Sequence, residues 1–301
     1  MENPLKDLAQ KPLGGGIGTA MRSGDAPRDW LGFANAKLNS LTKPLGSLGR
    51  LEEIAGKIVC IREQECPSHA DKVVYVFAGD HGVTEEGVSA YPKSVTHQMV
   101  RNFLANGAAI NVFSRCAGAE VVVVDVGVDA ELDSHSGLLD RKIRRGTHNM
   151  AKEPAMTDSE LGAALEVGRA LAQQARSHDL VAVGEMGIGN TTAAAAIAAA
   201  LLGKLVEEVT GTGTGVSPEG LIHKRLVIRK ALEVNALNQN CSPLEILQKV
   251  GGLEIAAMTG FLLEAQQQRV PAIIDGFIST AAAALACAIE PQVKDVLFAG
   301  H

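Results

Sequence analysis

The chain has 301 residues, of which 46% are hydrophobic but only 3% aromatic, and its formal net charge is −6. This length allows one large α/β core, or one large and one small core. The acidic balance, with no basic run interleaved with aromatic residues, argues against a nucleic-acid partner. No apolar run approaches the ~18–20 residues of a membrane span, and the N-terminus does not read as a signal peptide.

The five cysteines are scattered without a CxxC pair, and the eight histidines show no spacing typical of metal ligands. Such usage is typical of free thiols in a reducing compartment. We therefore expect a cytoplasmic protein without a metal site.

The order of the predicted elements points to an α/β fold. Residues 1–30 are expected to be loosely structured, and residues 34–61 to be mostly helical with an interruption at 43–49. Strands then alternate with helices, which predicts a doubly wound, mostly parallel sheet. The predicted strands are Val73–Phe77, Val121–Val126, Leu180–Val183, Ala272–Ile274 and Val296–Phe298. The predicted helices are Ser94–Leu104, Ala108–Cys116, Asp158–Ser177, Thr191–Leu202, Pro243–Gln268, broken at Gly251-Gly252, and Ile278–Ile289.

A glycine turn follows the strand that begins at Leu180. Gly187 and Gly189 allow the backbone to approach a ligand closely, and Asn190 and Thr191 suit a helix N-terminus. Such a turn favours phosphate, because its free N–H groups and the helix dipole both attract an anion. Glu185 is unexpected there, since a carboxylate repels phosphate. We expect it to handle a proton or a developing positive charge.

An acidic residue lies at or just after the end of four predicted strands. In open α/β sheets, ligands bind outside the carboxyl ends of the strands. The four residues could therefore face one crevice; the alternative is that they form turns and helix caps. They are Asp80, Asp125, Glu185 and Asp275.

The loop after the first strand begins with Asp80 and His81. An Asp–His pair suggests acid–base chemistry, but adjacent residues rarely face each other. We favour a loop that lines a ligand site, with Ser89 and Gln98 as hydrogen-bonding groups.

A second glycine turn, Gly211 to Ser217, carries hydroxyl side chains and could form an anion nest around Gly213. Lys224 follows and could supply a counter-charge for phosphate; the alternative is a flexible loop with a solvated lysine. Neither glycine turn matches GxGxxG or GxxxxGK[ST], which argues against a dehydrogenase or an NTPase. We predict no bound cofactor.

Seven short motifs occur in an order that resembles the nicotinate-nucleotide–dimethylbenzimidazole phosphoribosyltransferases, which act in cobalamin biosynthesis. Each motif is brief, but the ordered set is specific and spans nearly the whole chain. The motifs are Leu41–Glu53, Phe77–Val83, Gly87–Pro92, Asn106–Asn111, Gly184–Thr192, Gly211–Gly215 and Ile274–Gly276.

The resemblance implies transfer of the phosphoribosyl group from nicotinate mononucleotide to 5,6-dimethylbenzimidazole, with inversion at the anomeric carbon. It assigns Glu185 as the carboxylate near the reacting centre. The residues implied to bind phosphate and ribose are Gly187, Gly189, Asn190, Thr191, Gly213, Lys224 and Asp275. Those implied to line the benzimidazole pocket are Ser89, Gln98 and Met186.

The resemblance also implies a homodimer and two domains. These would be a small, mostly helical domain in residues 1–70, completed by C-terminal residues, and an α/β phosphoribosyl-binding domain in residues 71–301. In the family, a glutamate in a C-terminal Gly-Glu-Gly segment accepts the proton, and it has no counterpart before His301. We favour an incomplete sequence. The alternative is a non-catalytic or weakly active protein that binds nucleotide or benzimidazole.

Overall fold

A computed structural model describes residues 28–238 and 240–300, so the N-terminal segment predicted to be loosely structured lies almost wholly outside the described residues. The chain divides into two compact units, residues 1–69 and 70–301. Along the described chain, no helix combines the length and apolar character needed to cross a bilayer.

Between residues 28 and 69, the part of the first unit that the structure describes, lie two helices, α2 (Trp30–Asn39) and α3 (Arg50–Arg62). The Asp29 carboxylate caps α2 by accepting the Gly32 N–H at 2.9 Å. The predicted interruption of the helical stretch is confirmed, and Lys43 within it pairs with Glu52 of α3 at 2.8 Å.

The second unit is built on a six-stranded sheet in the order β3-β2-β1-β4-β5-β6. Every pairing is parallel, so the expected mostly parallel sheet is parallel throughout the described residues. The sequence missed β3, because three half-exposed residues at the sheet edge are too few to show a period. The strands are β1 (Lys72–Gly79), β2 (Ala119–Gly127), β3 (Leu138–Asp140), β4 (Leu180–Met186), β5 (Ala272–Ile274) and β6 (Leu297–Ala299).

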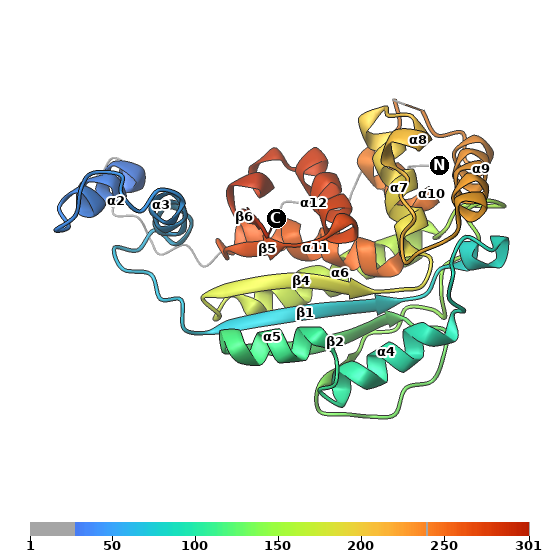
Figure 1. The fold of residues 1–301 in the computed structure, drawn as a ribbon, viewed down its shortest axis with the longest axis horizontal. Coiled ribbons are helices and arrows are strands. Elements are labelled where there is room, and N and C mark those ends of the chain that lie inside the picture. Colours follow the sequence, from blue (N-terminus) through green and yellow to red (C-terminus); the bar gives the residue numbers. More distant parts are fainter. Residues whose placement is uncertain (1–27, 239, 301) are drawn as a thin grey trace. The chain divides into compact units, whose positions relative to one another are not determined.

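Alternate side chains of β1 pack against helices on opposite faces of the sheet. On one face, Val76 and Ala78 join a core with Val100 and Phe103 of α4 (Ser94–Leu104). On the other, the Tyr75 ring lies 5.1 Å from the ring of Phe261 in α11 (Leu253–Gln267). Figure 1 shows α4 and α5 on the near face of the sheet and α6 behind it.

The predicted helices are confirmed to within a few residues, including the break at Gly251-Gly252. Sequence reasoning missed α9, although Ser217 caps it and Pro218 occupies its first turn. The short α8 and two single-turn segments were also missed. Besides α4 and α11, the helices of this unit are α5 (Ala109–Ala117), α6 (Asp158–Ala175), α7 (Asn190–Leu202), α8 (Val206–Val209), α9 (Pro218–Val234), α10 (Pro243–Val250) and α12 (Phe277–Ile289), and the 3₁₀ segments are η1 (Gly82–Glu86) and η2 (Pro291–Asp295).

Two glycines allow α6 and α11 to pack backbone against backbone. A Cβ at Gly168 would lie 1.8 Å from the Ala257 carbonyl oxygen, and one at Gly260 would lie 2.1 Å from that of Leu165. We expect Gly168→Ala to destabilise the protein by about 1–3 kcal/mol or more in urea unfolding, because backbone cannot move aside as a side chain can. Gly56→Ala in α3 is the control. Its methyl group would meet Ala34 Cβ at 4.0 Å, and equal stability of the two variants would contradict this packing.

Candidate active site

The carboxyl ends of β1 and β4 meet at the point where the strand order reverses. The chain leaves β1 toward β2 on one side and leaves β4 toward β5 on the other. This is the position at which open α/β sheets bind ligands. It brings the segment Gly79–His81 next to the segment Glu185–Gly187 (Figure 1).

The turn after β4 is held against three other segments. A Cβ at Gly187 would lie 2.2 Å from the Gly79 carbonyl oxygen, so only glycine fits there. Gly189 has a φ of +98°, and a Cβ on it would meet Thr84 and His81. The Ile188 N–H donates to Thr96 Oγ1 of α4 at 3.0 Å. These contacts fix the turn at the N-terminus of α7.

Glu185 lies at the end of β4 in register with Phe77, on the face that α11 covers. Its carboxylate accepts a hydrogen bond from the Asn190 amide. Desolvation raises the pKa of Glu185 to about 7, and the nearby Glu254 carboxylate adds to this; Asn190 and His81 act in the opposite direction. A carboxylate with such a pKa can both accept and release a proton near neutral pH.

Lys224 of α9 reaches the N-terminal turn of α7. Its ammonium donates to Thr191 Oγ1 at 2.7 Å, and its side chain is buried. Gly213 lies beside both groups, since a Cβ there would be 3.2 Å from Lys224 Nζ. Burial lowers the pKa of Lys224 to about 8. Within the described residues Lys224 forms no ion pair, so an anion at the helix N-terminus would supply its missing counter-charge.

The three residues predicted to line the base pocket have different environments in the structure. The Ser89 hydroxyl accepts the Tyr91 N–H at 3.3 Å within its own loop. Gln98 is exposed on α4. Met186 packs against the core that α4 forms with the sheet. Met186 and the helix that carries Gln98 lie on one face of the sheet, whereas Glu185 lies on the face that α11 covers.

Two of the four strand-end acids are engaged within the fold itself. Asp125 is buried, accepts the N–H groups of Gly127 and Val128, and pairs with Lys142 at 2.9 Å. Asp80 is also buried and accepts the Asp129 N–H at 2.8 Å. These two acids fix turns, as the alternative interpretation held. Asp275 lies at the end of β5, where a Cβ at Gly300 would be 2.9 Å from its carboxylate.

Sequence reasoning missed Glu254, the partner of His81. The two side chains are fully buried and meet at 2.6 Å, across 173 residues of sequence. One signal was present: Glu254 lies in the first turn after the break at Gly251-Gly252, and the next nine residues of the helix are apolar except for Thr259. A charged residue at such a position needs a partner.

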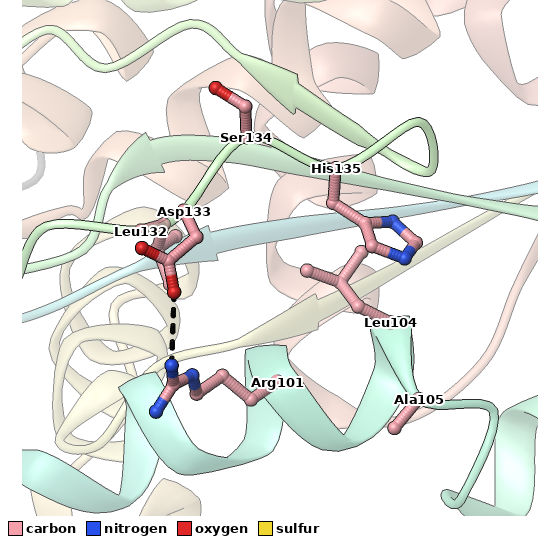
Figure 2. A pocket seen from close by; sticks show the side chains of 7 residues that line it. All are labelled: Arg101, Leu104, Ala105, Leu132, Asp133, Ser134 and His135. Carbon is pink, nitrogen blue, oxygen red and sulfur yellow. Dashed lines mark hydrogen bonds and ion pairs between the residues drawn. The ribbon is translucent and has the colours of Figure 1, made fainter.

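A separate pocket of about 250 Å³ lies between the end of α4 and the connection from β2 to β3 (Figure 2). An ion pair between Arg101 and Asp133, at 3.0 Å, spans it. The remaining lining residues are Leu104, Ala105, Leu132, Ser134 and His135, so the pocket includes no predicted site residue.

A family model described as Phosphoribosyltransferase (DBI_PRT) matches residues 26–301. The chain is 53% identical over 273 residues to the nicotinate-nucleotide–dimethylbenzimidazole phosphoribosyltransferase of Geobacter sp. (strain M21), covering 90% of this chain and 78% of that relative. The chain belongs to this phosphoribosyltransferase family. The resemblance predicted from the ordered motifs is thereby confirmed.

Other members of the phosphoribosyltransferase family agree in sequence and in fold. The relative of the same name from Thermus thermophilus is 50% identical over 273 residues, which cover 89% of this chain and 81% of that relative. The crystal structure of CobT from Thermus thermophilus matches with a TM-score of 0.87 at 48% identity, over 91% of this chain and 82% of that chain.

Proposed function

We infer that the protein transfers the phosphoribosyl group of nicotinate mononucleotide to 5,6-dimethylbenzimidazole, in the assembly of the cobalamin nucleotide loop. The products are α-ribazole 5′-phosphate and nicotinate. One observation carries this inference beyond family membership. The turn that begins with Glu185 ends, within six residues, at the Thr191 hydroxyl bound to the buried Lys224 ammonium. A carboxylate and a candidate anion site thus lie at the two ends of one short turn.

Phosphate and ribose are assigned to the turn and its neighbours. We propose that Lys224, Thr191 and the backbone at Gly213 bind the phosphate, because they combine a cation, a hydroxyl and a helix N-terminus. Gly187 and Gly189 let the backbone approach the ribose, and Asn190 orients Glu185 through its hydrogen bond. Asp275, at the neighbouring strand end, would contact the ribose edge.

Glu185 is the group we assign to the chemical step. When the bond from C1′ to the ring nitrogen breaks, its electron pair neutralises the pyridinium and nicotinate leaves. A carboxylate stabilises the positive charge that develops on the sugar. The incoming benzimidazole nitrogen donates its lone pair to C1′ from the opposite face, and the proton on the other ring nitrogen must then go to a base. The family resemblance gives that role to a glutamate of a C-terminal Gly-Glu-Gly segment, so we assign Glu185 to the stabilisation of the sugar cation.

The acceptor base is assigned to the α4 side of the switch point. We propose that Met186 provides apolar contact to the benzimidazole, and that Ser89 and Gln98 provide hydrogen bonds. Holding two rings on either side of C1′ contributes to the rate by orientation alone.

We also propose the finer organisation of the protein. The two units support a small helical domain in residues 1–70 and a doubly wound phosphoribosyl-binding domain in residues 71–301. The five free cysteines support residence in the reducing cytoplasm. A homodimer follows from the family resemblance, and sedimentation equilibrium would test it.

The proposed reaction predicts a simple product test. Purified protein mixed with nicotinate mononucleotide and dimethylbenzimidazole should release nicotinate and ribazole phosphate in equal amounts, measured by chromatography. Omission of dimethylbenzimidazole is the control and should suppress nicotinate release. Binding of both substrates by calorimetry without any product would instead support the binding-protein alternative.

A further inference from the structure

Three consecutive basic residues of α9 contact three different segments of the proposed site. They are His223, Lys224 and Arg225. Neighbouring residues of an α-helix point about 100° apart, so three in a row span about 200° of its circumference. Lys224, the middle one, donates to Thr191 Oγ1 of α7 at 2.7 Å. The other two therefore project to either side of the proposed phosphate position, where α9 packs between α7, α8 and η1 (Figure 1).

His223 contacts the segment that leads to the proposed acceptor-base loop. Its ring Nε2 lies 2.5 Å from the Glu86 carbonyl oxygen, and because a carbonyl only accepts, the ring nitrogen donates. Glu86 ends η1, three residues before Ser89. The same η1 packs against the phosphate turn, since a Cβ at Gly189 would lie 2.8 Å from Thr84 Cγ2. The His223 hydrogen bond thus joins the start of the acceptor-base loop to α9.

Other hydrogen bonds fix η1 from the segment after β3. The Gly82 N–H donates to Thr147 Oγ1 at 3.1 Å, and the Asn149 amide donates to Glu86 Oε1 at 2.8 Å. These bonds remain when His223 is replaced. Loss of the His223 hydrogen bond should therefore loosen the end of η1 without unfolding it.

Arg225 contacts the start of the second glycine turn. Its Nη2 donates to the carbonyl oxygens of Glu207 at 3.3 Å and Thr210 at 3.4 Å. These carbonyls lie at the end of α8, where helix carbonyls lack partners within the helix. The turn that follows closes on the phosphate position, because a Cβ at Gly213 would lie 3.2 Å from Lys224 Nζ. Since α9 begins where this turn ends, Arg225 joins the two ends of the turn.

Each of the two contacts has a surface ion pair beside it. Lys230 pairs with the Glu86 carboxylate at 3.8 Å, and Arg229 pairs with the Glu207 carboxylate. Both basic side chains are about half exposed, and such pairs contribute little to stability. They reach the same two acidic residues as the contacts described above, but they bind the side chains rather than the backbone. The chain therefore offers a matched control for each contact.

We propose that His223 and Arg225 are positioning residues that set the two loops on either side of Lys224. His223 holds the loop for the acceptor base, and Arg225 holds the glycine turn against the phosphate. Both act on the orientation of the bound substrates, which contributes to the rate. The assignment of each loop to its substrate rests on the proposed function, whereas the two contacts do not.

The two residues are distinguished by the KM that each one changes. His223→Ala should raise the KM for dimethylbenzimidazole about fivefold, as expected for one hydrogen bond, and should change that for nicotinate mononucleotide less than about twofold. Arg225→Met should do the reverse. We expect kcat to fall less than about twofold in both, since a loosened loop weakens the ground state and the transition state alike. A general loss of structure would raise both KM values together.

Conservative variants and the surface ion pairs provide the controls. His223→Gln keeps an N–H donor and should bring the KM for dimethylbenzimidazole back to within about twofold of the wild type. Arg225→Lys keeps one donor group and should show a smaller rise than Arg225→Met, so it carries the test if Arg225→Met does not fold. Lys230→Met and Arg229→Met should leave both KM values unchanged. Effects in these two controls as large as in His223→Ala and Arg225→Met would overturn the proposal.

Binding without turnover separates this proposal from the proposed function. Calorimetry with inorganic phosphate should show about fivefold weaker binding to Arg225→Met and unchanged binding to His223→Ala. With dimethylbenzimidazole as the probe, the two variants should exchange roles. Equal binding of both probes by the wild type and the two variants would overturn the positioning roles. An inactive wild type that still shows the exchange would count against the proposed reaction alone.

Discussion

Glu185→Gln is expected to lower kcat by about 10²–10³-fold and, at the same time, to stabilise the folded protein at alkaline pH. The rate falls because glutamine cannot carry the negative charge that stabilises the sugar cation. The KM for nicotinate mononucleotide should change little, since Lys224 and Thr191 still bind the phosphate.

The gain in stability follows from the sign of the pKa shift. The pKa of Glu185 is raised from 4.5 to about 7, so the folded protein retains this proton where the unfolded chain has lost it. Stability is therefore lost as the pH rises from about 4.5 to about 7, by up to about 3 kcal/mol. Partial exposure of the side chain reduces this to about 1–3 kcal/mol. Glutamine cannot ionise and avoids the cost.

Urea unfolding at pH 5 and pH 8 measures this difference. The wild type and Glu185→Gln should be nearly equal at pH 5, and the variant should be more stable at pH 8. Glu120→Gln serves as the control for loss of one negative charge at an exposed position. Full activity in Glu185→Gln would remove this residue from the chemical step, and reduced stability at pH 8 would contradict the assigned desolvation.

The parts of the site that sequence could predict are those formed by consecutive residues. The turn from Glu185 to Thr191 depends on glycine conformations and helix-start residues that are adjacent in the chain, so its shape can be read locally. Asp125 shows the limit of this reasoning. A strand-end acid looks the same in sequence whether it faces a ligand or, as here, accepts the next two backbone N–H groups.

Contacts between distant segments could not be predicted in the same way. His81 and Glu254 meet because the end of β1 and the first turn of α11 lie at the same edge of the sheet. This follows from the strand order, which no local sequence pattern contains. Lys224 was singled out as a candidate from the sequence, but the helix that carries it was not predicted. Its contact with Thr191 needed the direction of α9, which carries the side chain back toward α7.

Lys224→Met is expected to raise the KM for nicotinate mononucleotide by about 10–100-fold, because a buried charge-assisted hydrogen bond to phosphate contributes about 1.5–3 kcal/mol. Methionine is similar in length and apolar, so the packing of α9 is kept. We expect kcat to fall less than in Glu185→Gln, since Lys224 contacts the Thr191 hydroxyl and the phosphate position rather than the reacting carbon.

The same substitution should stabilise the protein when no ligand is bound. Burial lowers the pKa of Lys224 from 10.5 to about 8, so the folded state binds this proton more weakly than the unfolded chain. Burying the charged ammonium therefore lowers the free energy of unfolding by roughly 3 kcal/mol below about pH 8, and this loss disappears as the pH rises toward 10.5. Methionine carries no charge and avoids the loss. At pH 7 the unliganded variant should therefore melt at a higher temperature than the wild type.

Thermal unfolding with and without nicotinate mononucleotide distinguishes the two effects. The ligand should raise the Tm of the wild type, since it binds only the folded state, and should raise that of Lys224→Met far less. Lys230→Met is the matched control, because Lys230 lies on the same helix but is exposed. An equal ligand-induced shift in Lys224→Met and wild type would remove Lys224 from phosphate binding.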